Sequence, residues 1–238
     1  MSFSNKEFVY TELSSLDKKL LHLLQEQQQG SKAEALARGW TNFVPADAIT
    51  LATLVTHAIA QHHIPQPSAR VLDLGSGDGV SAMIFAMKGY ESFGIETAPW
   101  LVERAETLKS RLSKAEYSCK LPQFACGTYL PKKVRTILKK IGCSDRKLIL
   151  DDTRDGFRLL GVAPKRVDLF YVFPWTGQGE SLAWFMNFCA KPGSKLFSYA
   201  YPLSAAVSDL ELIFHEEVFL TTHEKNTVRG QYFVYEKK

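Results

Sequence analysis

The 238-residue chain has few cysteines and no long apolar run. None of its four cysteines forms a C-x-x-C pair, and no histidine lies at zinc-ligand spacing from two of them. We therefore expect reduced thiols, no metal site and a cytoplasmic protein. No 18 consecutive residues are apolar, so we expect no membrane span. The first residues also lack the basic and then apolar pattern of a signal peptide.

The chain lacks a large excess of either charge, because its formal net charge is only +4. Basic residues are nevertheless concentrated in one segment, which holds twelve Lys/Arg and three Asp/Glu between Arg104 and Lys147. Such a local field can attract an anionic partner. A solvated helix surface is the favoured interpretation, because charged side chains mostly lie in water. A nucleic acid partner stays open but is not favoured.

Short apolar runs of strand type alternate with amphipathic runs of helix type, which predicts parallel strands and right-handed crossovers. We expect strands at 70–74, 92–96, 148–151, 167–173, 195–199, 214–221 and 231–235. We expect helices at 14–29, 46–63, 81–88, 100–114 and 182–189. Gly30 is expected to end the first helix. The last two strands flank a polar stretch, as in an antiparallel hairpin.

The fold class expected from this order is α/β. It comprises a Rossmann-like, mostly parallel seven-stranded sheet with a C-terminal antiparallel hairpin, N-terminal helices and a basic insertion. Residues 1–45 would form an N-terminal helical extension, and residues 46–238 the main domain. The segment 119–147 fits no core element and is interpreted as the insertion, with its own short basic helix at 132–140.

One glycine-rich loop carries most of the chemical information. Val71-Leu-Asp-Leu-Gly-Ser-Gly-Asp-Gly79 places a strand before three glycines at alternate positions. Glycines let the chain turn sharply and let a ligand approach the main chain. The candidate binding residues of this loop are Asp73, Gly75, Ser76, Gly77, Asp78 and Gly79.

The acidic residues of this loop help to identify the ligand class. The third glycine comes one residue too early for a dinucleotide fingerprint. Asp73 and Asp78 would repel a pyrophosphate, and the repulsion grows where water is excluded. They suit a ligand that carries a sulfonium and an ammonium group. The local chemistry therefore favours S-adenosylmethionine (SAM) as the cofactor over NAD.

Further cofactor-binding candidates follow the next two expected strands. Glu96 ends the strand at 92–96, where a carboxylate can accept both ribose hydroxyl protons; Thr97 lies beside it. Glu96 could instead be an exposed helix N-cap. Asp152 could accept a hydrogen bond from the adenine amino group, with Thr153 beside it. Asp151 and Asp155 compete for that role.

These motifs resemble those of the class I SAM-dependent methyltransferases. The resemblance rests on VLDLGSGDG, KGYESFGIE and TAPWLVERAE, and it extends from about Trp40 to Ala105. Phe43-Val44-Pro45 is similar to a segment that precedes the domain in a branch of bacterial methyltransferases and related protein lysine methyltransferases. The resemblance implies the fold and the cofactor, SAM. It does not securely imply the substrate.

The methyl acceptor is expected at the end of the strand at 167–173, where Phe173-Pro174-Trp175 follows. This chain lacks the Asn/Asp-Pro-Pro-aromatic motif of enzymes that methylate base amines. Phe173 is a candidate for the cofactor site, although core is the favoured interpretation. Candidates for the substrate site are Pro174, Trp175, Glu180 and Phe43. No catalytic residue is named, because alignment of an already activated methyl group can supply most of the rate.

The function that this sequence predicts is methyl transfer from SAM to a protein side chain or a small molecule. One alternative is an RNA methyltransferase that uses the basic segment 104–147. Another is a SAM-binding module without catalysis. The sequence does not identify the acceptor or the oligomeric state.

Overall fold

A computed structural model describes residues 6–9, 15–40, 43–114, 120–142, 154–174, 178–203, 209–221 and 227–238. The strands in these ranges are β1 (Lys6–Val9), β2 (Arg70–Leu74), β3 (Glu91–Glu96), β4 (Gln123–Cys126), β5 (Leu169–Val172), β6 (Lys195–Tyr199), β7 (Leu210–Thr221) and β8 (Thr227–Lys237). The helices are α1 (Ser15–Ala37), α2 (Ala48–Ala60), α3 (Val80–Met87), α4 (Pro99–Lys114), α5 (Lys132–Lys140), α7 (Gly156–Leu160), α8 (Gly179–Cys189) and the 3-10 helix η1 (Pro164–Arg166).

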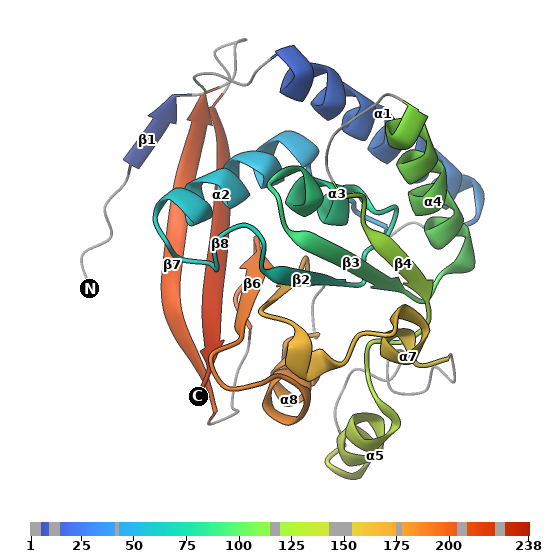
Figure 1. Cartoon of the computed structure of the whole chain (residues 1–238), viewed down its shortest axis with the longest axis vertical. Coiled ribbons are helices and arrows are strands. Elements are labelled where there is room, and N and C mark those ends of the chain that lie inside the picture. Colours follow the sequence, from blue (N-terminus) through green and yellow to red (C-terminus); the bar gives the residue numbers. More distant parts are fainter. Residues whose placement is uncertain are drawn as a thin grey trace.

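All of these strands form one sheet in the order β1-β7-β8-β6-β5-β2-β3-β4 (Figure 1). The strands β6, β5, β2, β3 and β4 are parallel, whereas β8 is antiparallel to both β6 and β7. Without β1, this is a seven-stranded Rossmann-like sheet with a C-terminal antiparallel hairpin. The expected fold class is therefore confirmed. The sequence analysis missed β1, which extends the sheet beside β7.

The interpretation of 119–147 as lying outside the core is wrong for β4. This strand pairs with β3 and forms the edge of the sheet, with Phe124 opposite Gly94 and Ala125 opposite Ile95. It has only four residues, and only Ala125 among them is buried, so no apolar run indicates it. The basic helix expected at 132–140 is confirmed as α5. The expected strand 148–151 lies outside the described residues.

The first long helix does not end at Gly30, as the sequence analysis expected, but continues to Ala37. A Cβ atom at position 30 would lie 2.6 Å from Nη2 of Arg104 on α4. Gly30 therefore lets the Arg104 side chain approach the backbone of the helix closely. Glycine costs about 1 kcal/mol of helix propensity relative to alanine, and the contacts of Arg104 offset this cost.

Helices cover both faces of the sheet, with α1 to α4 on one side and α5, α7 and α8 on the other (Figure 1). Each face has its own apolar cluster, because side chains alternate along a strand. On β5, Leu169 and Tyr171 pack with the first group of helices, and Phe170 and Val172 with the second. Among the described helices, none is both long and apolar enough to cross a membrane.

Helix α2 links the N-terminal part of the chain to the hairpin. Asp47 caps it by accepting a hydrogen bond from the Thr50 amide at 2.8 Å. Leu51, Leu54 and other apolar side chains of α2 are fully buried, and each contributes about 1.5–3 kcal/mol. The helix lies close over β8, since a Cβ atom at Gly230 would lie 2.9 Å from Thr50 Cγ2. The first and last parts of the chain thus form one core.

Candidate functional site

The predicted ligand loop follows β2 at the carboxyl-end edge of the parallel strands. The backbone amides of Gly75 and Ser76 both donate to the Ile95 carbonyl of β3, at 2.9 and 3.0 Å. The Gly79 amide closes the loop on the Ser76 carbonyl at 2.9 Å. Helix α3 then starts directly at Val80. This strand–loop–helix arrangement is the place where open α/β sheets bind ligands.

The glycines of the loop are required by the backbone and by close packing. Gly75, Gly77 and Gly79 have φ angles of +84°, +52° and +83°, which side chains of other residues rarely adopt. A Cβ atom at Gly79 would lie 2.7 Å from Ala105 Cβ. By contrast, apart from its chain neighbours, no described residue has an atom within 4 Å of where a Cβ atom of Gly75 would be. Protein packing thus requires Gly79, whereas Gly75 borders open space.

Glu96 connects this loop to the start of α4. Its Oε2 accepts a hydrogen bond from the Gly77 amide at 3.0 Å. Its Oε1 accepts from the amides of Thr97 and Ala98 at 2.7 and 2.9 Å, and from the Thr97 hydroxyl at 3.3 Å. The carboxylate therefore caps the turn before α4 and also holds the glycine loop. Glu96 thus has the capping role of one interpretation from the sequence, although its side chain is half-buried and not exposed, and its binding of a ribose stays a prediction.

Two carboxyl groups are buried next to the loop. Asp73 and Asp78 are 2% and 4% exposed, and the Oδ2 atom of each has no hydrogen-bond partner among the described residues. Burial, and then the negative charge of Glu96, raises the pKa of Asp73 well above its ordinary value. Burial also raises the pKa of Asp78, while the nearby Ser31 and Arg104 oppose that rise. A cationic group would stabilise both carboxylates.

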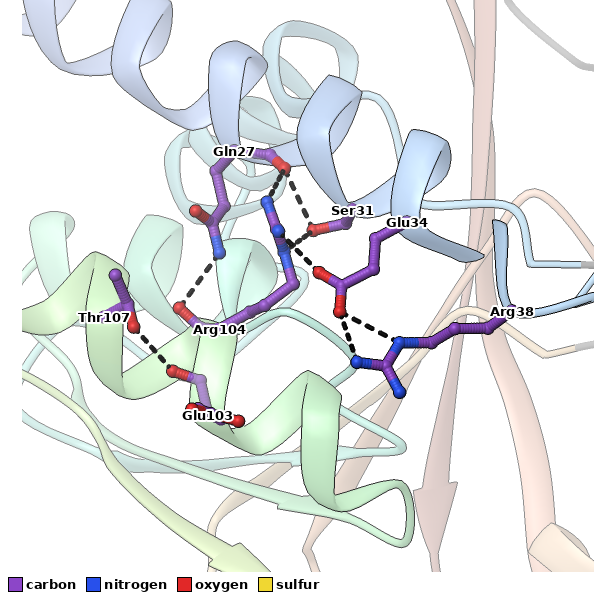
Figure 2. A network of polar contacts seen from close by, with 7 residues as sticks. All are labelled: Gln27, Ser31, Glu34, Arg38, Glu103, Arg104 and Thr107. Atoms are coloured by element: carbon purple, nitrogen blue, oxygen red, sulfur yellow. Dashed lines mark hydrogen bonds and ion pairs between the residues drawn. The ribbon is translucent and has the colours of Figure 1, made fainter. Parts of the chain in front are cut away.

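Helix α1 is bound to α4 through Arg104 (Figure 2). Arg104 also lies close enough to Asp78 for its charge to lower the pKa of that carboxyl group. The Arg104 guanidinium donates to Ser31 Oγ at 2.7 Å, to Glu34 Oε2 at 2.9 Å and to the Gln27 carbonyl at 3.2 Å. The Gln27 amide donates back to the Arg104 carbonyl at 3.0 Å. These contacts fix the N-terminal helix beside the glycine loop. The sequence analysis assigned none of them.

Aromatic side chains lie next to the same loop. Phe43 Cε2 is 3.8 Å from where a Cβ atom of Gly77 would be. The Phe43 ring meets Trp100 at 6.0 Å, and Trp100 meets Trp40 edge-on at 5.6 Å. The structure thus brings Phe43 together with the predicted cofactor-binding residues. Trp40 and Trp100 were not predicted, although both occur in the segments that carry the family resemblance.

A second aromatic group lies at the carboxyl ends of β5 and β6. Phe173 is half-buried between Tyr199 and Tyr201, with ring centroids at 4.9 and 6.3 Å. Tyr201 is 56% exposed. Tyr201 is the third residue of a turn in which its amide donates a hydrogen bond to the Tyr199 carbonyl at 2.9 Å. The central residue of this turn, Ala200, has a φ of +66°. A positive φ at alanine is strained, and such strain clusters at functional sites. The turn is missed by sequence reasoning, because alanine gives no signal for it.

The remaining predicted residues are placed less closely. Pro174 is buried directly after Phe173, and Glu180 is half-exposed in the first turn of α8. No contact joins Glu180 to the glycine loop among the hydrogen bonds and ion pairs of the described residues. Asp152, Thr153 and Trp175 lie outside the described residues. Within the same ranges, no three His, Cys, Asp or Glu side chains are grouped so that they could hold a metal ion.

Comparison with known proteins identifies the fold alone. No protein-family model matches the sequence, and no curated protein matches it. An RNA methyltransferase from Salinibacter ruber, solved with S-adenosyl-L-homocysteine, is similar at a TM-score of 0.50 with 15% identity, over 82% of this chain and 94% of that one. A putative RNA methyltransferase from Pyrococcus horikoshii is similar at 0.51 with 13% identity, over 92% and 97%.

A third similar structure comes from work on the conversion of a disulfide bond into a thioacetal group during echinomycin biosynthesis. It has a TM-score of 0.52 and 14% identity, over 86% of this chain and 91% of that one. The comparisons give no support for the narrower resemblance to protein lysine methyltransferases. The strand order, the glycine loop and these structural neighbours together show that the chain has the class I methyltransferase fold.

Proposed function

We propose that this protein is a SAM-dependent methyltransferase. The observation that carries the proposal is the Gly75–Gly79 loop, which borders buried carboxyl groups that have no partner at Oδ2 among the described residues. An oxygen buried without a partner costs about 1–3 kcal/mol. A ligand with a cationic group offsets that cost, and a phosphate does not. The residues present therefore fit SAM better than they fit a dinucleotide.

In this proposal, each predicted residue has a defined task. The loop from Gly75 to Gly79 lets the ligand approach the main chain, and Asp73 and Asp78 provide negative charge near its cationic groups. Glu96 and Thr97 would accept hydrogen bonds from the ribose hydroxyls. SAM supplies a methyl group that is already activated on a sulfonium. The residues of the site then have to orient the acceptor and exclude water.

Aromatic rings around the edge of the sheet support a role in orienting the acceptor. Phe173, followed by Pro174, lies with Tyr201 at the end of β5, next to β2 in the sheet. A ring close to a sulfonium gains cation–π attraction of about 0.5–2 kcal/mol. Phe43 lies against Gly77. Trp175, Glu180, Asp152 and Thr153 remain predictions.

The acceptor class stays a separate question. A protein side chain or a small molecule is the expectation from the sequence, with RNA as the alternative. One structural neighbour is an RNA methyltransferase and another is a putative RNA methyltransferase, but identities of 15% and 13% carry no substrate over to this chain. A SAM-binding module without catalysis differs from all of these, because it predicts binding without transfer to any acceptor.

Calorimetry with SAM and with S-adenosyl-L-homocysteine tests the proposal. We expect both to bind the wild-type protein, and Glu96→Ala to weaken both. Glu103→Ala is the matched control, because Glu103 lies exposed on α4 and its carboxylate makes no ion pair with a described residue. Methyl-labelled SAM with fractionated cell extract then reports transfer. Absence of SAM binding by the folded wild-type protein would overturn the proposal.

A further inference from the structure

The structure divides the basic segment into two groups of residues that the sequence does not distinguish. The first group is used within the fold. Arg104 pairs with Glu34, Lys109 with Glu106, Arg111 with Glu26 and Lys120 with Glu91, all at 3.2 Å or less. Each of these four cations thus lies beside a carboxylate of the fold.

The second group lies on α5. Lys132, Lys133, Lys139 and Lys140 are exposed, whereas Val134 and Leu138 are buried in the core between α5, α8 and the sheet. None of these four lysines makes an ion pair with a described residue. The apolar side of the helix is thus used by the fold, and its charged side faces water.

More cations without ion-pair partners in the described ranges lie on α7 and η1 and next to them. Arg154, Arg158, Lys165 and Arg166 are all exposed. Within 154–166 the acidic residue is Asp155, whose carboxylate caps α7 by accepting from the amides of Phe157 and Arg158. Lys165 and Arg166 also line a hollow with Glu91 and Asp168, which pair with other cations. Helices α5 and α7 contribute to one core around Phe185 of α8. We call the surface made by these four residues and the four lysines of α5 the basic surface.

Electrostatic effects on one thiol indicate that the parts of the basic surface adjoin. Burial raises the pKa of Cys189 to about 11, and Asp155 adds to the rise. Lys133 on α5 and Lys165 on η1 both oppose it. Charges from both elements therefore act at the end of α8. Helices α5, α7 and α8 also share one apolar cluster, so the two groups of cations lie on the same face of the sheet.

Helix α8 adds a pair of aromatic rings on the same face of the sheet. Trp184 and Phe188 are one helical turn apart and stack with centroids 5.3 Å apart at 11°. Trp184 is half-buried against the core, and Phe188 is 39% exposed. Helix α8 packs against α5, as Figure 1 shows. Stacked, partly exposed rings beside exposed cations are the combination that binds single-stranded nucleic acids.

One end of the basic surface, the start of α5, adjoins the proposed active edge. Helix α5 begins after a short turn that leaves the carboxyl end of β4. In this turn, the Tyr129 hydroxyl accepts a hydrogen bond from the Gln178 amide at 2.7 Å. Gln178 directly precedes α8. The turn thus connects the strand end to both helices, so a strand bound along α5 and α8 would pass the edge where Glu96 and the glycine loop lie.

We infer that the basic surface and Phe188 bind a single-stranded nucleic acid, which supplies the methyl acceptor. Backbone phosphates contact the lysines of α5 and the cations of α7 and η1, and an unpaired base stacks on Phe188. This inference rests on the proposed methyl transfer, because it names the class of molecule that carries the acceptor. A duplex fits less well, since its bases are stacked internally. An anionic membrane fits less well, since α5 buries Val134 and Leu138 in the protein core.

Fluorescence anisotropy with labelled 12-nucleotide RNA and DNA of one sequence, and with the matching duplex, tests the inference. Lys139→Gln/Lys140→Gln removes two charges from α5. Lys32→Gln/Lys114→Gln is the control, because it removes the same charge from exposed positions on α1 and α4, which cover the opposite face. We expect weaker single-strand binding in the α5 variant alone. Its log–log salt slope should fall by about 1.4, because each phosphate that a lysine neutralises contributes about 0.7 to the slope.

The stacking interaction has its own variants. Phe188→Ala should weaken single-strand binding by about tenfold, within the range for the loss of one base–aromatic stack. Phe188→Tyr keeps the ring and should bind as the wild type does. A preference for RNA or for DNA identifies the source of the strand and supports the inference in either case.

Several outcomes would overturn the inference. They are no oligonucleotide binding by the wild type, equal losses in the α5 and control variants, and binding to phosphatidylserine vesicles but not to oligonucleotides. Calorimetry with SAM on the same preparations separates the two proposals. Intact SAM binding without oligonucleotide binding contradicts this inference alone. Oligonucleotide binding without SAM binding contradicts the proposed cofactor.

Discussion

The backbone amide of Gly77 donates a hydrogen bond to the side-chain Oε2 of Glu96 at 3.0 Å. This side-chain contact adds to the two backbone hydrogen bonds, from the Gly75 and Ser76 amides to the Ile95 carbonyl, that join the loop after β2 to β3. Because Glu96 Oε1 also binds the two amides that lead into α4, the carboxylate sets the distance between the loop and that helix. Loss of the carboxylate should therefore affect the loop before it affects the sheet.

A pair of glycine substitutions can separate ligand binding from backbone strain. Gly75 and Gly193 have φ angles of +84° and +78°, and in the described parts of the chain only their own neighbours lie within 4 Å of a Cβ atom at either position. Alanine at each should therefore cost a similar 1–2 kcal/mol or so of stability. Only Gly75→Ala should weaken SAM binding, by roughly tenfold or more, as one extra carbon does in a filled site. Thermal unfolding and calorimetry measure the two effects, and equal SAM affinities would contradict the site.

Asp73→Asn should stabilise the ligand-free protein while weakening SAM binding. The pKa of Asp73 is raised in the folded state. The contribution of this carboxyl group to the stability of the wild type is therefore greatest below the unfolded pKa of about 3.9. That stability is lost as the pH rises toward the raised pKa. The asparagine side chain does not titrate, so the variant does not lose stability in this way. At neutral pH the variant should gain about 1–3 kcal/mol in the free energy of unfolding.

Melting temperatures of the wild type and Asp73→Asn between pH 4 and pH 8 check this prediction. The difference between the two proteins should widen with increasing pH in the absence of ligand. Saturating SAM should narrow it, because a cation beside the carboxylate stabilises its charged form. A difference that is constant with pH would show that Asp73 does not titrate in this range.

Arg104→Lys should loosen α1 without removing the positive charge. The guanidinium reaches Ser31, Glu34 and the Gln27 carbonyl together, and a lysine ammonium cannot match this fork. Loss of the bonds to Ser31 and to the carbonyl should cost on the order of 2 kcal/mol. Hydrogen exchange should be faster in α1 than in the wild type, while amides of β5 and β6 stay protected. Arg111→Lys is the control, since Arg111 makes one exposed pair with Glu26.

Ala200→Gly should stabilise the protein, although glycine usually destabilises. Ala200 has a φ of +66°, which costs an L-residue about 1–2 kcal/mol and costs glycine little. At the exposed Ala163, where φ is −79°, the same substitution should instead lower stability by about 0.5–1 kcal/mol. Denaturant unfolding gives both values. A loss of stability for Ala200→Gly would show that the turn is not strained.

Local sequence signals predicted the parts of the candidate site that lie on one short stretch of chain. The glycine loop and Glu96 follow strands whose apolar residues are consecutive, so both strand ends could be located before the structure. Phe43 was connected to the site through the family resemblance and lies against Gly77. Phe173 was ambiguous from its sequence alone, because core and site residues have the same apolar character at a strand end.

The sequence by itself determined the strands β2, β3, β5 and β6, the antiparallel hairpin and the acidic glycine loop, because these depend on residues close together in the chain. Tertiary structure decided what depends on contacts between distant residues. Strand β4 exists because β3 supplies its hydrogen bonds, and α1 continues past Gly30 because Arg104 packs there. It also decided which cations of the basic segment pair with described carboxylates and which lie exposed near Phe188. Charge pairing and burial are properties of neighbours in space, and the linear pattern does not contain them.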